Sequence, residues 1–150
     1  MKQLNTFYDH TNLFFKNLKY MIMNKRNIEL EAICKTANLY VEGIHMGNIE
    51  MLRSAFHPKA MMYGCSGDNV VVTEIEGLYS FVSANESPSK TGEPHQCFIS
   101  DVHYAGNAAF VEMVEESGYG NDYTNYFQLL KIEGHWVIVS KSYNATPSKK

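Results

Sequence analysis

The clearest pattern of apolar and polar positions lies between residues 123 and 143, where two apolar runs flank Glu133-Gly134. Aromatic and β-branched residues dominate both runs, and the Glu-Gly pair between them is a short turn signal. This pattern predicts two long antiparallel strands joined as a hairpin. A second hairpin is predicted over residues 95–104 and 108–116, around Gly106-Asn107. The C-terminal third of the chain is therefore expected to form four long antiparallel strands.

The first half of the chain shows the three- and four-residue spacing of helices. Apolar residues recur at these steps over residues 28–44, which predicts an amphipathic helix. Asn48 is expected to be the N-cap of a second, shorter helix, and Pro58 is expected to end that helix. Two strands, over residues 60–65 and 70–75, follow around a Ser-Gly-Asp turn.

A short helix introduced by Gly77 is expected to bury Leu78, Phe81 and Val82. Residues 83–94, which come next, are rich in turn formers and almost free of apolar side chains. This composition predicts an exposed loop. The loop is either a plain surface connection or a flap over a pocket, since long loops often carry function.

Helices near the N-terminus followed by long strands indicate an α+β fold, with a curved, mostly antiparallel sheet and helices on one face. A chain of 150 residues accommodates one domain. We assign this domain to residues 28–146 and treat residues 147–150 as a tail. Residues 1–27 are an N-terminal extension, either an additional helix or a disordered segment. Its apolar positions at roughly helical spacing are Phe14, Phe15, Leu18, Met21 and Ile22.

Charge and hydropathy exclude several kinds of partner. The formal net charge is -3 with 19% charged residues, and this balance lacks the basic excess that binding a phosphate backbone requires. Nucleic acid is therefore not an expected partner. No run approaches the roughly 18 apolar residues that cross a bilayer, and the N-terminus lacks the pattern of a signal peptide. We predict a cytoplasmic protein without a membrane partner.

The three cysteines, Cys34, Cys65 and Cys97, stand far apart in the sequence. They form no CxxC pair and no cysteine-histidine spacing typical of a zinc site. Free thiols are the simplest interpretation. The sequence also lacks a glycine-rich phosphate loop, and we predict neither a metal nor another cofactor.

Alternation along the strands sorts the side chains of the first hairpin onto two faces. If Glu133-Gly134 is a two-residue turn, one face holds the more continuous apolar surface and the single tryptophan, and we assign it to the helices. The opposite face, with Tyr126, Val139 and Lys141, is too apolar to be simply hydrated, so we predict a homodimer through it. The inward face comprises Asn125, Phe127, Leu129, Trp136, Ile138 and Ser140.

Several short motifs follow one another along the chain and cover most of residues 28–145. They are Tyr40-Val41-Glu42-Gly43 with Gly47-Asn48, Phe56-His57-Pro58-Lys59-Ala60, Val102 with Gly106-Asn107-Ala108-Ala109, Tyr123-Thr124-Asn125-Tyr126, and Leu129-Leu130-Lys131-Ile132-Glu133-Gly134-His135-Trp136-Val137-Ile138. In this order they resemble the nuclear transport factor 2-like superfamily, and among its branches the so-called putative lumazine-binding family. The resemblance implies a cone-shaped sheet around the helices, an internal cavity and a dimer.

The side chains expected inside the cone are aromatic and poor in charge, which suits a small, flat, apolar ligand with a few atoms to hydrogen-bond. Alternation in the second hairpin adds Phe98, Ser100 and Tyr104 to this inner face. The alternative is that the same side chains form an ordinary core. The candidate ligand-binding residues are Tyr40, Tyr63, Phe81, Phe98, Tyr104, Asn125, Phe127, Trp136 and Ser140.

A second candidate site lies on the outer face of the sheet. Alternation directs Asp101, His103 and Glu112 outward, with the two carboxylates opposite each other. Carboxylates beside a histidine could act as a general acid and base, and His57, near the end of the second helix, could reach the cavity mouth. The alternative interpretation of the outward cluster is a surface or interface ion pair.

Three functions are compatible with these features. The first is a small dimeric protein whose cone binds an aromatic or heterocyclic molecule. The second is a cofactor-independent isomerase, dehydratase or cyclase, as the likeness to ketosteroid isomerases and polyketide cyclases implies. Such an isomerase needs carboxylates inside the pocket. The alternation along the strands placed no carboxylate there. The third is a structural dimerisation module without a ligand.

Overall fold

The computed structural model describes residues 2–149, with the side chains of residues 15–149. It divides into two compact units, Met1–Ala32 and Ile33–Lys150. Helix α1 (Lys2–Met46) begins in the first unit and ends in the second. The helix predicted over residues 28–44 is thus part of a much longer one. The side chain of Phe14, counted in the predicted apolar spacing, lies outside the described residues.

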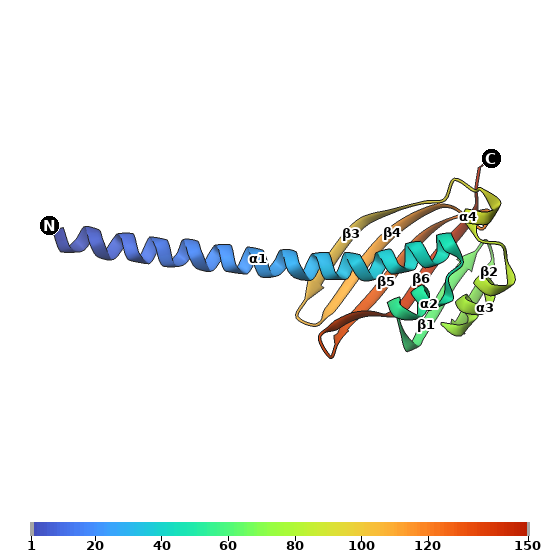
Figure 1. Ribbon diagram of the computed structural model, residues 1–150, viewed down its shortest axis with the longest axis horizontal. Coiled ribbons are helices and arrows are strands. Elements are labelled where there is room, and N and C mark those ends of the chain that lie inside the picture. Colours follow the sequence, from blue (N-terminus) through green and yellow to red (C-terminus); the bar gives the residue numbers. More distant parts are fainter. Residues whose placement is uncertain (1, 150) are drawn as a thin grey trace. The chain divides into compact units, whose positions relative to one another are not determined.

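The second unit contains the C-terminal part of α1, three short helices and one six-stranded sheet (Figure 1). The short helices are α2 (Ile49–Ala55), α3 (Glu76–Ala84) and α4 (Pro88–Thr91). The strands are β1 (Phe56–Ser66), β2 (Asn69–Glu74), β3 (Gln96–Ala105), β4 (Ala108–Gly118), β5 (Asn121–Ile132) and β6 (His135–Pro147).

The strand order is β2-β1-β6-β5-β4-β3. Every neighbouring pair is antiparallel except β1 and β6, which run parallel. The sheet curves, and helices cover its concave side (Figure 1). The predicted α+β, cone-shaped fold is therefore confirmed. Among the described residues, no helix is both long and apolar enough to cross a membrane.

The core forms where one face of α1 meets the concave side of the sheet. Ile33, Ala37, Tyr40 and Ile44, spaced at three and four residues, are at most 3% exposed. The Thr36 hydroxyl, on the same helix, donates a hydrogen bond of 3.0 Å to the backbone carbonyl of the tryptophan on β6. Each fully buried aliphatic or aromatic side chain contributes about 1.5–3 kcal/mol. The sheet side of this core includes Val111, Met113, Phe127, Leu129 and Ile138.

Asn48 caps α2 as predicted, because its side-chain oxygen accepts a hydrogen bond of 3.2 Å from the backbone N–H of Met51. The prediction that Pro58 ends this helix is wrong. The helix ends at Ala55, and Phe56 already has extended backbone angles and begins β1. Pro58 lies where the pairing of β1 with β6 is irregular, a position that tolerates a residue without an N–H.

One prediction about the segment after β2 is wrong, and another is correct only in part. In α3, Tyr79 is 4% exposed and Phe81 is 44% exposed, so Tyr79 occupies the buried position expected for Phe81. Residues 83–94 are not uniformly an exposed loop, because they include α4 and the buried residues Ser87 and Pro88. Sequence composition recognised the turn formers but not the burial that α4 obtains from its surroundings.

A β-bulge in each of two strands changes which side chains face inward. In β6, Leu129 pairs with Ile138 and Gln128 with Ser140, so Val139 is an extra residue. From this point onward the alternation reverses. Lys141 becomes 2% exposed, and the prediction that Ser140 faces inward and Lys141 outward is wrong.

The second bulge lies in β3. Ile99 pairs with Met113 and Asp101 with Glu112, which leaves Ser100 as the extra residue. The alternation before the bulge is therefore reversed relative to the prediction. Phe98, expected inside, is 51% exposed, and the predicted inward position of Phe98 and Ser100 is wrong.

Candidate functional site

A partly enclosed cavity of about 350 Å³ lies between α1, α3 and the concave side of the sheet. This volume is at the lower end of the roughly 300–1,000 Å³ of ligand pockets. Most of the lining is aromatic or aliphatic. The residues that line it are Tyr40, Ile44, Met62, Val71, Thr73, Gly77, Leu78, Phe81, Glu115, Tyr119, Tyr123, Lys141 and Tyr143. Two of these, Glu115 and Lys141, carry charge.

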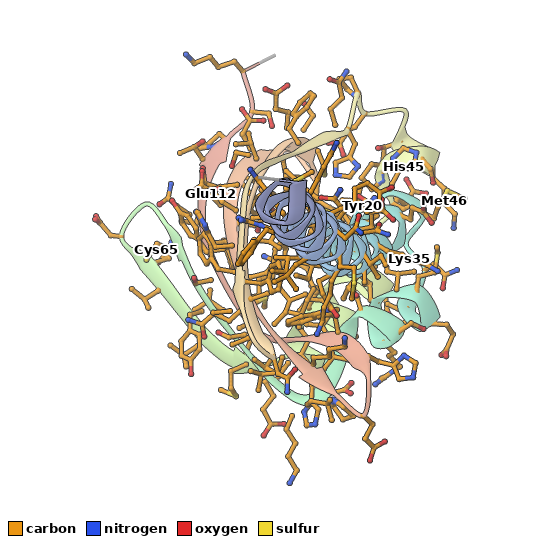
Figure 2. The ribbon with its side chains drawn as sticks, turned by 90° about the vertical axis from the view of Figure 1, so that its left-hand side faces the viewer. Tyr20, Lys35, His45, Met46, Cys65 and Glu112 are labelled. Carbon is orange, nitrogen blue, oxygen red and sulfur yellow. The ribbon has the colours of Figure 1, made fainter. Side chains whose placement is uncertain are left out.

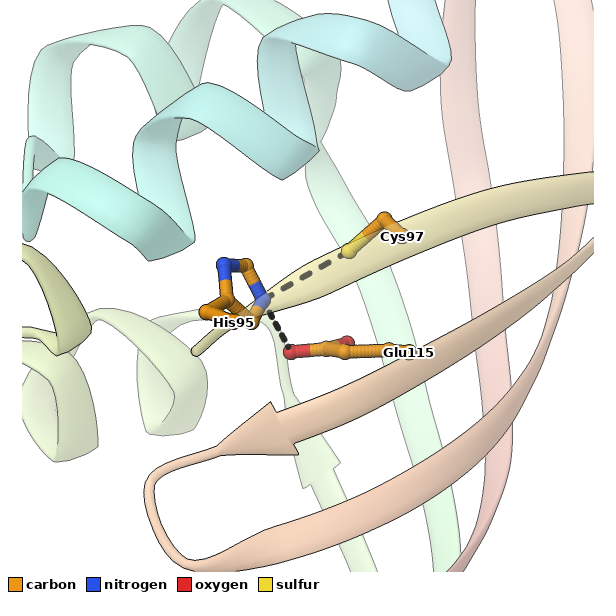
Figure 3. A group of neighbouring side chains, drawn as sticks. All are labelled: His95, Cys97 and Glu115. Atoms are coloured by element: carbon orange, nitrogen blue, oxygen red, sulfur yellow. Dashed lines mark hydrogen bonds and ion pairs between the residues drawn. The ribbon is translucent and has the colours of Figure 1, made fainter. Parts of the chain in front are cut away.

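Glu115, on β4, is the most extensively hydrogen-bonded side chain of the cavity. One carboxylate oxygen, Oε2, accepts bonds from the Tyr40 hydroxyl at 2.9 Å and from Nδ2 of Asn125 at 3.0 Å. The other, Oε1, lies 3.1 Å from Nε2 of His95, as Figure 3 shows. Burial acts to raise the pKa of Glu115, but the hydrogen bond from His95 and the positive charge of Lys141 outweigh it. The pKa therefore lies below its ordinary value, and Glu115 is ionised.

The absence of a side chain at Gly118 leaves room for the carboxylate of Glu115. A Cβ atom built on Gly118 would collide with Oε1 of Glu115. Glycine at this position therefore lets the carboxylate occupy its hydrogen-bonding position three residues earlier in the chain. Local sequence and tertiary packing together hold the carboxylate in one orientation.

A chain of polar groups leads from Glu115 away from the cavity. His95, whose side chain is 1% exposed, stacks on the ring of His45 at a centroid distance of 5.5 Å. The Nδ1 atoms of these two rings are 3.4 Å apart. His45 and His95 also line a surface groove together with Val41, Glu42, Met46 and Met51. The two imidazoles can therefore relay a proton between Glu115 and that groove.

His95, Cys97 and Glu115 also have the donor types that a zinc ion accepts, with ligand atoms within 4.8 Å of one another (Figure 3). Nε2 of His95 lies 3.5 Å from the Cys97 sulfur. Burial raises the pKa of this thiol well above its ordinary value, and the charge of Glu115 raises it further. We interpret the three side chains as a hydrogen-bonded group that positions Glu115, because hydrogen bonds account for the contacts among them.

Lys141, on β6, is the other charged group of the cavity. Its Nζ lies 4.0 Å from the ring centroid of Tyr143, 5.6 Å from that of Tyr40 and 5.8 Å from that of Tyr123. Among the described residues, none hydrogen-bonds to this amino group. Burial lowers the pKa of Lys141 to about 8, and the negative charge of Glu115 only partly opposes this effect. At pH 7 about a tenth of the amine is then neutral, compared with well under a thousandth for an unperturbed lysine.

Some predicted ligand-binding residues lie in or beside the cavity. Tyr40 and Phe81 line it. Asn125 is fully buried and binds Glu115, while the Phe127 ring packs against Tyr40 at a centroid distance of 4.9 Å. These four side chains therefore belong to the cavity or to the layer that supports it.

The other predicted ligand-binding residues do not line the cavity. Tyr104 and Trp136 pack edge to face, with centroids 6.4 Å apart, in another part of the core. Tyr63 is 43% exposed. Phe98 and Ser140 are turned away by the two bulges.

The predicted catalytic residues also lie outside the cavity lining. Nε2 of His103 is 2.9 Å from Asp101, and these side chains are 73% and 50% exposed respectively. Glu112 accepts a hydrogen bond of 2.8 Å from the Ser100 hydroxyl, and Figure 2 shows it on the side of the sheet away from His45. Nδ1 of His57 accepts a bond from the backbone of Lys59. The structure brings Asp101 and His103 together, but at the protein surface.

Sequence reasoning missed the three central residues of the site. Glu115 could have been found, because it continues the alternation of Ala109, Val111 and Met113, all of which are buried. Lys141 could not, since its inward position depends on the bulge at Val139. The role of His95 depends on its tertiary contact with Glu115 and has no local signal.

The cone-shaped α+β fold is that of the nuclear transport factor 2-like class. A family model described as "Putative lumazine-binding" matches residues 28–144. The chain belongs to this family, and membership indicates small-molecule binding.

Similar proteins come from both fungi and bacteria. The chain is 29% identical to "Aldolase FrzH" of a Cladobotryum species, over 79% of this chain and 93% of that protein. It also resembles a crystal structure of an NTF2-like protein of unknown function from Shewanella baltica OS155, with 30% identity, a TM-score of 0.73, and coverage of 80% of this chain and 95% of the other. Another such protein, from Methylobacillus flagellatus KT, has 25% identity, a TM-score of 0.71, and coverage of 78% and 91%.

Proposed function

We propose that this protein is an enzyme that binds a small, largely apolar carbonyl compound in the cone and moves a proton on the carbon next to the carbonyl. One observation carries this proposal. An ionised carboxylate, Glu115, and the amino group of Lys141 line the same apolar cavity. A carboxylate base and a group that stabilises charge on the carbonyl oxygen are what enolate or enamine formation requires.

The residues around the cavity supply the parts of this reaction. The aromatic walls bind the apolar body of the substrate and exclude water, which strengthens electrostatic interactions inside. Glu115 accepts the proton from the carbon, and the His95–His45 pair exchanges protons between Glu115 and the surface groove. The name of the fungal relative, an aldolase, supports this class of chemistry, because aldol reactions pass through the same carbanion equivalent.

Exchange of carbon-bound hydrogen tests this function without knowledge of the natural substrate. The protein is incubated in D₂O with phenylacetone or 2-tetralone, and loss of the proton next to the carbonyl is followed by NMR. We expect catalysed exchange, and Glu115→Gln should slow it by about 10²–10⁴-fold, the usual contribution of a general base. Glu116→Gln is the matched control, because Glu116 is the next residue on β4 and is exposed.

A thermal-shift assay with the same ketones separates the remaining alternatives. Stabilisation without exchange would leave a binding protein that does not catalyse this reaction. Neither stabilisation nor exchange with any ketone of the set would contradict the proposal and favour a structural module.

We further propose that the protein is a homodimer through the outer face of β3, β4, β5 and β6. This face carries a shallow depression lined mostly by apolar residues of these strands, including Phe110 and Leu130, together with the polar side chains of His103 and Gln128. The rings of Phe110 and Tyr126 stack there with centroids 6.0 Å apart, and Tyr126 is 38% exposed. Sedimentation at micromolar concentration tests this proposal: a monomer contradicts it, whereas Leu130→Glu should dissociate a dimer.

A further inference from the structure

We propose that Lys141 forms a covalent Schiff base with the carbonyl carbon of the substrate inside the cone. This inference rests on the proposed function, since it requires a carbonyl compound in the cavity. It adds the covalent attachment point and restricts the substrate to aldehydes and unhindered ketones.

The position of the amino group is the first argument. Lys141 is on the inner face of β6 because the bulge at Val139 reverses the alternation there. Its Nζ is held among the rings of Tyr143, Tyr40 and Tyr123 and faces the cavity, where a ligand would lie. A cation buried only for stability is normally paired or hydrogen-bonded. This amino group forms neither a hydrogen bond nor an ion pair with the described residues, so it is available to react.

The protonation state of Lys141 also suits attack on a carbonyl group. The amine must be neutral to attack a carbonyl, and burial in an apolar pocket is a general way to produce a nucleophilic lysine. The titratable groups facing it along the cavity wall are Tyr40 from α1, Glu115 from β4, Tyr123 from β5 and Tyr143 from β6, together with Tyr119. Only Glu115 among them is charged near neutral pH. Burial acts against this single negative charge and lowers the pKa of Lys141 to about 8.

The reaction balances with the groups of the cavity and protons from solvent. Lys141 first loses a proton to solvent, and the neutral amine attacks the carbonyl carbon. One N–H proton passes to the carbonyl oxygen, which gives a neutral carbinolamine. A proton from solvent then adds to the hydroxyl group, the C–O bond breaks, and water leaves. The net change is ammonium plus carbonyl to iminium plus water, and Glu115 remains an ionised base in the same cavity.

Trapping by reduction tests the proposal on the 150-residue chain. Benzaldehyde is added at pH 7.5 with sodium cyanoborohydride, whose hydride converts an iminium into a stable secondary amine. Peptide mass mapping then compares the initial rate at Lys141 with the rates at Lys59 and Lys90, which are exposed. We expect Lys141 to react at least about tenfold faster, because a larger fraction of it is neutral. Raising the pH from 7 to 9 should bring its rate to a plateau while the rates at exposed lysines continue to rise.

Variants separate this inference from the proposed function. Lys141→Met keeps the length and apolar character of the side chain and should abolish selective trapping, whereas Lys59→Met should leave it unchanged. If benzaldehyde stabilises the wild-type protein but Lys141 reacts no faster than Lys59, the Schiff base is excluded and the proposed function stands. If benzaldehyde neither stabilises the protein nor modifies Lys141 selectively, and ketone exchange is also absent, both proposals fail. Mapping of the wild-type chain decides the matter even if Lys141→Met does not fold.

Discussion

The two faces of one sheet each carry acid–base groups, and they differ in what surrounds those groups. On the outer face of β3, the side chains of Asp101 and His103 are at least half exposed and share a single contact of 2.9 Å. On the inner face, Glu115 is 2% exposed and has three hydrogen-bonding partners. Solvent screening makes an exposed pair weak, whereas a buried charge interacts strongly with each neighbour. Chemical reactivity is therefore expected on the inner face.

The largest expected difference between the faces is in stability. Glu115→Ala would leave Tyr40, Asn125 and His95 without their shared acceptor inside the protein. Removing one partner from a buried, charged hydrogen-bond network costs about 3–5 kcal/mol. We expect a loss of this size in the free energy of unfolding, measured with urea. A loss below about 1 kcal/mol would mean that the network does not stabilise the fold.

The titration of Lys141 is expected to have a somewhat smaller effect on the free energy of unfolding. Its pKa is about 8 in the folded protein, compared with 10.5 for the unperturbed side chain. Between these values the unfolded chain binds more protons, so stability rises as the pH is raised from about 8 to 10.5. Relative to Lys141→Met, the wild type should gain roughly 2–3 kcal/mol over this window. Equal pH dependence of the two proteins in thermal or urea unfolding would contradict the lowered pKa.

Glu115 should show the opposite dependence at acidic pH. Its folded-state pKa lies below the ordinary 4.5, so its contribution to stability is present above pH 4.5 and is lost as the pH falls through the folded-state value. Glu115→Gln should flatten the acid side of the stability curve. The corresponding variant of exposed Glu116 is the control, and the same flattening with that variant would argue against a special role for Glu115.

The smallest change in the free energy of unfolding is expected for substitutions on the outer face of the sheet. Asp101→Asn and His103→Gln should each change the free energy of unfolding by no more than about 0.5 kcal/mol, as usual for exposed ion pairs. Neither should alter the rate of ketone exchange. A large loss of exchange in His103→Gln would contradict this expectation. It would indicate that Asp101, His103 and Glu112 on the outer face take part in the reaction.

Alternation along the strands predicted much of the inner surface, and its errors have a common cause. The two-residue turn is present, with positive φ values of 50° at Glu133 and 84° at Gly134, and Ile132 pairs with His135 as expected. Phe127 and Trp136 consequently lie inside. Beyond the bulges the same rule fails, because one extra residue exchanges the two faces of a strand. Phe98, Ser140 and Lys141 were all misplaced for this reason.

The sequence by itself determined the α+β class, the two long hairpins, the cap at Asn48 and the apolar face of α1, because each depends on neighbours within a few residues. The inward position of Glu115 also follows from the sequence, because Glu115 continues the alternation that begins at Ala109. Only the tertiary structure decided the partners of that carboxylate and the burial of Lys141. Tyr40, His95 and Asn125 lie 75, 20 and 10 positions from Glu115. Pairing of β4 with β3 and β5 brings His95 and Asn125 to it, whereas Tyr40 meets it only when α1 packs on the sheet. A low pKa for a lysine likewise requires a closed apolar environment, which no local segment can provide.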